Sequence, residues 1–191
     1  MTAAELLSVA AFDAGHHAQA FPSFGSERTG APVVAYCRID DAPIRTREPI
    51  VTPDALIIQD VTLLPHADVL SGLPADAYVL LNSEHTPQQL GLADFVAGHR
   101  ADRIVNVPAT QIALEHIGRP VPNVVLLGGF AALTGVITMA GLELAVAERF
   151  HGRLVAGNQA AAIEAFERVS AATADVTDRG VMEGAVDATA D

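Results

Sequence analysis

The sequence contains no lysine and no tryptophan, and it has a single cysteine among its 191 residues. Its 11 basic residues are therefore all arginines, and they are outnumbered by 23 acidic residues, which gives a formal net charge of −12. This balance argues against nucleic-acid binding, because phosphate backbones are bound by clustered lysine and arginine side chains. We expect no nucleic-acid partner.

Long hydrophobic runs are also missing. No uncharged apolar segment approaches the roughly 20 residues that a membrane-spanning helix needs, and the most apolar stretch, 121–144, is interrupted by several glycines. The first residues lack the basic start and apolar centre of an export signal. The lone Cys37 cannot form an internal disulfide. We therefore expect a cytoplasmic protein with no membrane partner.

Short apolar runs of the kind found in strands buried on both faces occur at 55–60, 78–83 and 103–107. Segments 66–73 and 87–98 lie between them and have lengths that suit helical or loop connections. Strands that alternate with such connections indicate crossover units and a largely parallel sheet.

Helical periodicity and turn signals predict the remaining elements. These are a helix over 2–14, a strand over 33–39 that returns antiparallel through 44–47, and helices over 109–117, 123–138, 140–150 and 155–172. The predicted fold class is α/β, a three-layer sandwich around a mostly parallel sheet with some antiparallel strands. Residues 1–172 are expected to form one domain, and the acidic residues 173–191 a disordered tail.

Single reactive residues do not combine into a catalytic set. Cys37 lies within an apolar strand, which favours an inert buried thiol over a nucleophile. His16 and His17 lack acidic or cysteine partners at a ligand spacing, so metal binding is disfavoured. Glu115 and His116 are consecutive on a helix and point to different faces. We predict no catalytic residue and no metal ligand.

Two further features have both a functional and a structural interpretation. Asp60 lies at the carboxyl end of a strand, where ligands approach an open α/β sheet, but it also suits the cap of the following helix. The run 127–132 faintly resembles a dinucleotide-binding loop, yet it lacks the order G-x-G-x-x-G. Close helix packing through small residues is the better interpretation of that run.

The glycine- and proline-flanked stretch that ends at Pro32 is the best functional candidate, because loops on a rigid sheet commonly carry binding sites. Glu27 and Arg28 either pair with each other at the surface or leave Arg28 to bind a phosphate or a partner's carboxylate. The candidate binding residues are Gly25, Ser26, Glu27, Arg28, Thr29 and Gly30.

Several separated blocks of the sequence, in order and spanning roughly 2–169, resemble one known family. The blocks are 18–22, 30–33, 38–45, 53–60, 118–120 with Asn123, 127–130 and 148–150. They are similar to the gamma subunit of pyruvate:ferredoxin oxidoreductase and its relatives that act on other 2-oxoacids.

The resemblance implies a subunit of a cytoplasmic multi-chain oxidoreductase, most simply pyruvate synthase. That enzyme converts pyruvate, coenzyme A and oxidised ferredoxin to acetyl-CoA, carbon dioxide and reduced ferredoxin. Thiamine diphosphate, magnesium and iron–sulfur clusters are held by the alpha, beta and ferredoxin-like delta subunits, so this chain alone is expected to bind no cofactor. The resemblance gives the gamma chain the roles of scaffold and interface, with loop 25–30 on the side where coenzyme A docks.

The sequence departs from the family pattern in two places. Relatives begin with a strand and a glycine-rich loop before the first helix, whereas this sequence begins directly with the helix, so a first strand is expected to be missing through a misplaced start. Thr29 stands where many relatives carry arginine, which weakens a strong anion site. The alternatives are a gamma subunit for a branched-chain 2-oxoacid, 2-oxoglutarate or an aryl glyoxylate, and a non-enzymatic binding or assembly module.

Overall fold

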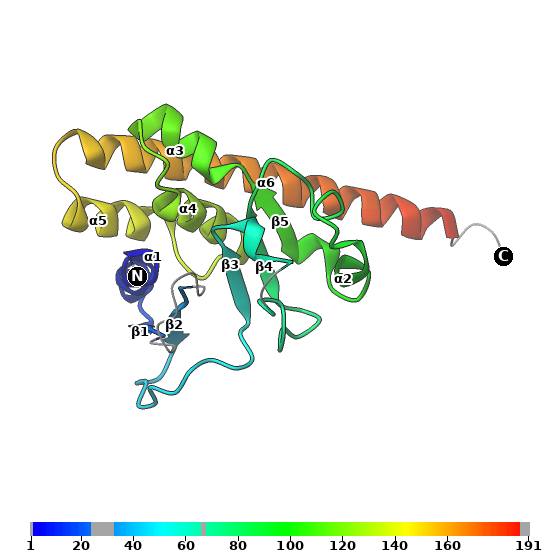
Figure 1. The fold of residues 1–191 in the computed structure, drawn as a ribbon, viewed down its shortest axis with the longest axis horizontal. Coiled ribbons are helices and arrows are strands. Elements are labelled where there is room, and N and C mark those ends of the chain that lie inside the picture. The colour runs from blue at the N-terminus through cyan, green and yellow to red at the C-terminus, as the bar shows by residue number, and fades with distance from the viewer. Residues whose placement is uncertain (1, 24–32, 66–67, 188–191) are drawn as a thin grey trace.

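The computed structural model describes residues 2–23, 33–65 and 68–187, with side chains up to residue 175. A helical layer lies on one side of the strands, and the last helix projects well beyond the body of the molecule (Figure 1). The helices are α1 (Thr2–Asp13), α2 (Ala93–Ala97), α3 (Ala109–Ile117), α4 (Asn123–Thr134), α5 (Met139–Arg149) and α6 (Arg153–Asp187), and short 3-10 turns span Val61–Leu63 and Ala101–Arg103.

The central sheet is parallel and has the strand order β3 (Ala55–Ile58), β4 (Tyr78–Asn82) and β5 (Ile104–Val107). The side chains of alternate β4 residues pack into two separate hydrophobic cores on the two faces of the sheet. Leu80 packs into the larger core beneath the helices, and Val79 and Leu81 pack into a smaller core. Because both faces of β4 are buried, a continuous apolar run forms this strand. The predicted three-layer α/β fold is confirmed.

The larger core lies between the sheet and helices α1, α3, α4, α5 and α6. Helix α4 is its centre, and its residues from Val124 to Ala131 are all buried. A helix that is apolar on every side needs neighbours all round. The smaller core, on the opposite face of the sheet, is closed by α2 and by the loops around Leu64, Leu70 and Leu90.

A second, antiparallel sheet pairs β1 (His17–Pro22) with β2 (Ala35–Asp40). The predicted partner of β2 was wrong: residues 44–47, expected to return along it, have no regular secondary structure. The chain leaves β2 through a turn in which the Ala42 amide donates to Asp40 Oδ1 at 2.9 Å. β1 has only one side chain, Phe21, that marks it strongly as a strand, so its sequence signal is weak.

Helix α4 is shorter than the single helix predicted over 123–138. It ends at Thr134, because Gly135 adopts a left-handed conformation with φ of 66° and its amide donates to the Ala131 carbonyl. Thr138 then caps α5 by accepting a hydrogen bond from the Gly141 amide. The sequence signal for this break was the isolated Gly135 followed by Thr138.

Helix α6 is longer than predicted and continues to Asp187. Residues 173–187 of the expected disordered tail, 173–191, thus belong to this helix, and 188–191 lie outside the described residues. Within the part of the chain that the structure describes, no helix is both long and apolar enough to cross a membrane.

Candidate functional site

The predicted binding residues Gly25, Ser26, Glu27, Arg28, Thr29 and Gly30 all lie outside the described residues. The structure does describe the two strands that flank them, β1 and β2. Segment 24–32 connects β1 to β2, and the two strands stay paired up to its edge, where the Ser23 amide donates to the Val34 carbonyl at 2.9 Å. The candidate segment therefore leaves and re-enters the fold on adjacent, hydrogen-bonded strands.

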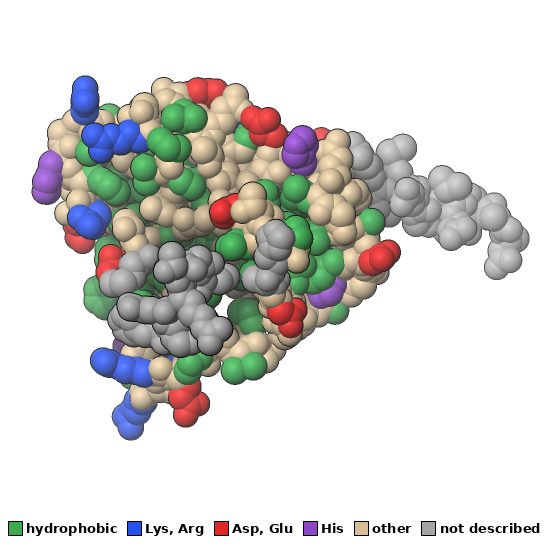
Figure 2. Space-filling model, in the orientation of Figure 1, with side chains coloured by type: hydrophobic (Ala, Val, Ile, Leu, Met, Phe, Trp, Pro, Cys, Tyr) green, Lys and Arg blue, Asp and Glu red, His purple; other side chains and the backbone are tan. Residues whose placement is uncertain are grey.

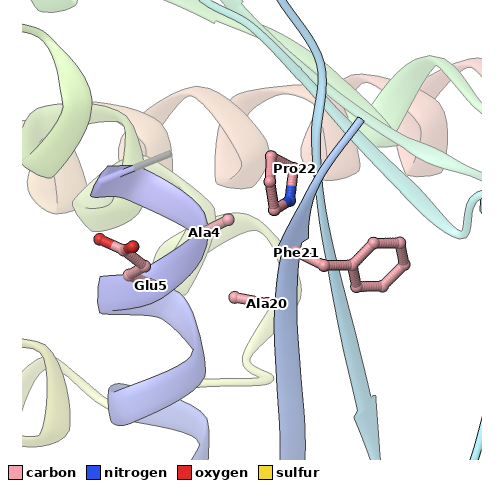
Figure 3. A pocket seen from close by; sticks show the side chains of 5 residues that line it. All are labelled: Ala4, Glu5, Ala20, Phe21 and Pro22. Atoms are coloured by element: carbon pink, nitrogen blue, oxygen red, sulfur yellow. The ribbon is translucent and has the colours of Figure 1, made fainter. Parts of the chain in front are cut away.

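One face of this two-stranded ribbon is anchored to the core. Ala18, Cys37 and Ile39 alternate onto the face that packs against the larger cluster. Ala4 of α1 and Ala20 of β1 approach each other between the helix and the strand, while the Phe21 ring points away from α1 (Figure 3). A hollow of only about 20 Å³ remains there. It has room for about one water molecule and not for a cofactor.

The opposite face of the ribbon carries Gln19, Phe21, Tyr36 and Arg38, and we call it the ribbon face. Gln19 is opposite Arg38 in the strand register, and Phe21 is opposite Tyr36. The centroids of the two aromatic rings are 5.3 Å apart, and the Arg38 guanidinium carbon lies 5.4 Å from the Phe21 ring centroid. The arginine is thus held against an aromatic pair next to the candidate segment.

Two polar atoms on the ribbon face are buried and have no hydrogen-bond partner among the described residues: Gln19 Oε1 and Arg38 Nη1. A buried polar atom left unsatisfied costs about 1–3 kcal/mol, so a ligand or partner that completes the bonds would recover that cost. Arginine donates well to carboxylate or phosphate oxygens, and a glutamine carbonyl accepts from an amide or hydroxyl. The sequence did not single out these two residues, because β1 was not predicted and their register was unknown.

The carboxyl ends of the parallel strands are a second place where α/β proteins bind ligands. There, Asn82 Nδ2 donates to the Gln59 carbonyl and to Thr110 Oγ1, each at 2.8 Å, and Asn82 Oδ1 accepts from the Thr110 amide at 3.0 Å. This single side chain ties β3, β4 and the start of α3 together. Its bonding capacity is used within the fold, which indicates a structural role.

Asp60 at the same edge is the cap that the sequence favoured. Its carboxylate accepts from the Thr62 hydroxyl at 2.6 Å and from the Thr62 amide at 3.0 Å. These hydrogen bonds lower the pKa of Asp60 below its ordinary value, because they stabilise the ionised form. The capping interpretation is confirmed.

The other reactive residues also have structural surroundings. Burial raises the pKa of the Cys37 thiol to about 12, which keeps it protonated. His16 Nδ1 lies 2.7 Å from Asp41 Oδ1, and His116 Nε2 lies 2.6 Å from Glu164 Oε2. Hydrogen bonds from His116 and then Arg168 lower the pKa of Glu164. Among the described residues, no three His, Cys, Asp or Glu side chains gather as a metal site would require.

The glycine pair 128–129 serves helix packing, as the sequence analysis favoured. A Cβ atom added to Gly128 would lie 2.1 Å from the carbonyl oxygen of Ala162 on α6. Helices α4 and α6 therefore touch through their backbones, which no side chain at residue 128 would allow.

Comparison with known proteins identifies the family. Residues 1–168 match the family described as pyruvate ferredoxin/flavodoxin oxidoreductase. This chain belongs to that family. Pyruvate synthase subunit PorC of Methanosarcina barkeri is 46% identical over 146 residues, which cover 76% of this chain and 77% of the relative. PorC of Methanothermobacter thermautotrophicus is 42% identical over 169 residues, 88% of each chain.

Members of the family with other names are similarly close. The pyruvate/ketoisovalerate oxidoreductases common subunit gamma of Pyrococcus abyssi is 41% identical over 168 residues, covering 88% of this chain and 89% of the relative. The crystal structure of the pyruvate oxidoreductase subunit PORC from Thermotoga maritima matches with a TM-score of 0.70 at 31% identity, covering 87% of each chain. The resemblance read from the sequence blocks is confirmed.

Proposed function

We propose that this chain is the gamma subunit of a multi-subunit 2-oxoacid:ferredoxin oxidoreductase that acts on pyruvate. The complex would oxidatively decarboxylate pyruvate, transfer the acetyl group to coenzyme A, and pass two electrons to ferredoxin. The observation that carries this proposal is the similarity to PorC subunits at 42–46% identity over most of the chain. The chain is a non-catalytic subunit of this enzyme.

The chemistry of the chain's own residues supports a non-catalytic role, with the cofactors held by other subunits. Iron–sulfur clusters are held mainly by several cysteine thiolates, and the sequence has one cysteine. That cysteine is a thiol with a raised pKa on the buried face of the ribbon. Clusters, thiamine diphosphate and magnesium would therefore be held by alpha, beta and ferredoxin-like delta subunits in the cytoplasm, and ferredoxin would be the external acceptor.

The contribution of this chain would be scaffold, interface and part of the wall on the coenzyme A side. Segment 25–30 and the ribbon face beside it form the proposed wall. Arg38 supports this, because its buried Nη1 has no partner within the described structure and a guanidinium suits phosphate or carboxylate oxygens. Coenzyme A carries phosphate groups and an adenine ring, which suit an arginine held beside Phe21 and Tyr36.

A second candidate substrate has its own support. The Pyrococcus abyssi relative is named as common to pyruvate and ketoisovalerate enzymes, so a branched-chain 2-oxoacid is the alternative to pyruvate. A gamma subunit shared in this way leaves the choice of substrate to the other subunits.

The test is to express this chain together with alpha, beta and delta subunits from the same genome and to isolate the complex under anaerobic conditions. Reduction of ferredoxin or a viologen dye is then measured with coenzyme A and each of pyruvate, 2-oxoisovalerate, 2-oxoglutarate and phenylglyoxylate. Reduction with pyruvate is the expected result. Preference for another 2-oxoacid would show that pyruvate is not the main substrate of the complex. No reduction with any of the four would overturn the proposal and would favour a non-enzymatic assembly module.

A further inference from the structure

Helices α1 and α5 form a surface that the proposed site does not use. The two helices cross each other, since Figure 1 shows α1 end-on and α5 along its length. Ala10 lies against Gly141, where an added Cβ would be 3.0 Å from the Ala10 carbonyl oxygen, and Glu5 and Glu148 line the same hollow. Between the helices is an open hollow of about 190 Å³, which we call the α1–α5 groove. It is lined by Glu5, Leu6, Val9, Ala145, Glu148 and Arg149.

The groove continues into exposed hydrophobic side chains. Val9 is 39% exposed, and Phe12, one turn further along the same stripe of α1, is 74% exposed. On α5, Leu144 is 53% exposed and stands one turn before Glu148. Both helices that line the groove thus leave apolar side chains exposed to solvent. A cluster of this kind, unlike a single exposed leucine, marks an interaction surface.

Acidic side chains border the α1–α5 groove and the exposed apolar side chains beside it. Glu5 and Glu148 line the groove, and Asp13 ends α1 beyond Phe12. Arg149 is the one basic lining residue among them. Within the described residues, no ion pair engages Glu5, Glu148 or Arg149. The acidic side chains at the groove therefore outnumber the one arginine, and its border carries a net negative charge. Figure 2 shows arginine side chains toward the left, the side on which Figure 1 shows α5, so the acidic excess belongs to the lining of the groove and not to that whole side of the molecule.

The negative charge at the border of the groove indicates which kind of partner can bind there. Anionic lipid and nucleic acid are repelled by an acidic rim on a chain of net charge −12. A second copy is disfavoured as well, because a two-fold interface sets each patch against itself and would bring Glu5 and Glu148 against acidic groups of the same kind. What fits is a different protein chain with apolar side chains flanked by lysine or arginine.

We propose that the α1–α5 groove is a docking surface for another subunit of the complex, through a segment with an apolar ridge and basic flanks. This inference rests on the proposed function, which supplies the companion subunits. Phe12 and Val9 are the apolar contacts, and Glu5 and Glu148 select the partner by charge. The residues of the ribbon face do not line this groove.

The test uses the wild-type chain, two groove variants and one control. The variants are Phe12→Ala and the double charge reversal Glu5→Arg with Glu148→Arg. The control is Leu114→Ala, a side chain on α3 that is 49% exposed. Each tagged chain is titrated with the purified alpha, beta and delta subunits from the same genome, at low and high salt. Circular dichroism and denaturant unfolding of each variant establish that folding is intact.

Both groove variants are expected to weaken association by about tenfold or more, as truncation of an interface anchor does, while Leu114→Ala leaves it unchanged. The charge-reversed variant is also expected to lose most of the salt dependence. If the wild type binds and folded groove variants bind equally well, the groove is not the interface. If the isolated chain is a dimer that only the groove variants dissociate, a second copy is the occupant and the proposal is overturned. A wild-type chain that binds no companion overturns the proposed function itself.

Discussion

Gly128 of α4 lies directly against the backbone of Ala162 on α6, and an added Cβ would approach the Ala162 carbonyl oxygen to 2.1 Å and its Cα to 2.8 Å. The neighbouring Gly129 faces only side chains, with Val169 Cγ2 at 3.2 Å and Leu80 Cδ2 at 3.3 Å from its added Cβ. The central helix pair is therefore fixed at one position by backbone contact and at the next by side chains that can adjust.

Replacing Gly128 by alanine is expected to destabilise the fold by more than the roughly 1–3 kcal/mol typical of overpacking, because the clash is with backbone atoms. Gly129→Ala is the matched control, and a smaller loss is expected because flexible side chains can move and alanine favours helix. Denaturant unfolding of both variants measures the difference. Equal stability of Gly128→Ala and the wild type would show that α4 and α6 are further apart than described.

The His116–Glu164 contact makes stability depend on pH in the acid range. The hydrogen bond from His116, with a further one from Arg168, lowers the folded pKa of Glu164 below its ordinary value of 4.5. The ionised carboxylate therefore stabilises the fold above that ordinary value, and the stabilisation is lost as the pH falls through the folded pKa. The Glu164 side chain is 26% exposed, so solvent screening holds the contribution to about 1 kcal/mol or less.

Unfolding free energies of the wild type and Glu164→Gln across the acid range check this prediction. The wild type should be more stable near neutral pH, and the gap should close as Glu164 becomes protonated. Glu167→Gln, an exposed position on the same helix, should show no such gap. A gap that stays constant from neutral to strongly acidic pH would mean that the carboxylate charge is not what stabilises the contact.

Cys37 is expected to be unreactive in the folded protein. With its pKa raised to about 12 by burial, only about one thiol in ten thousand is ionised at pH 8, and the thiolate is the reactive form. Labelling by a thiol reagent should therefore be slow in buffer and fast in denaturant. Cys37→Ala should keep the activity of the assembled complex. Rapid labelling of the native chain would contradict the described position of Cys37 on the packed face.

Arg38 is predicted to act in binding and not in turnover. Replacing it by alanine in the assembled complex should raise the KM for coenzyme A by about tenfold, the loss of roughly one charged hydrogen bond, with kcat little changed. Arg100→Ala is the control, since that exposed arginine pairs with Asp102 away from the ribbon. An unchanged KM for coenzyme A, or an equal effect of both substitutions, would remove Arg38 from the proposed wall.

The parallel half of the fold was predictable from the sequence because its signals are local. Runs such as 78–83 are apolar throughout, and a strand buried on both faces requires that. The packing role of Gly128 and the capping role of Asp60 were predictable for the same reason. Each follows from a residue type and its place in the chain, without knowledge of distant neighbours.

The ribbon was not predictable in the same way. His17–Pro22 carries a weak strand signal, so β2 was assigned the wrong partner, and the register that sets Gln19 opposite Arg38 could not be derived. The α1–α5 groove depends on how two helices distant in sequence meet. The candidate segment 25–30 came from its glycine and proline setting and from family resemblance, and it stays a prediction.

The most direct measurement is an add-back experiment. The companion subunits are prepared without this chain, and pyruvate- and coenzyme A-dependent dye reduction is followed as the purified chain is titrated in. Activity is expected to rise from near zero and to level off at one copy of this chain per catalytic unit, while the chain alone reduces nothing. Full activity without it, or turnover by the isolated chain, would contradict its assignment as a non-catalytic gamma subunit.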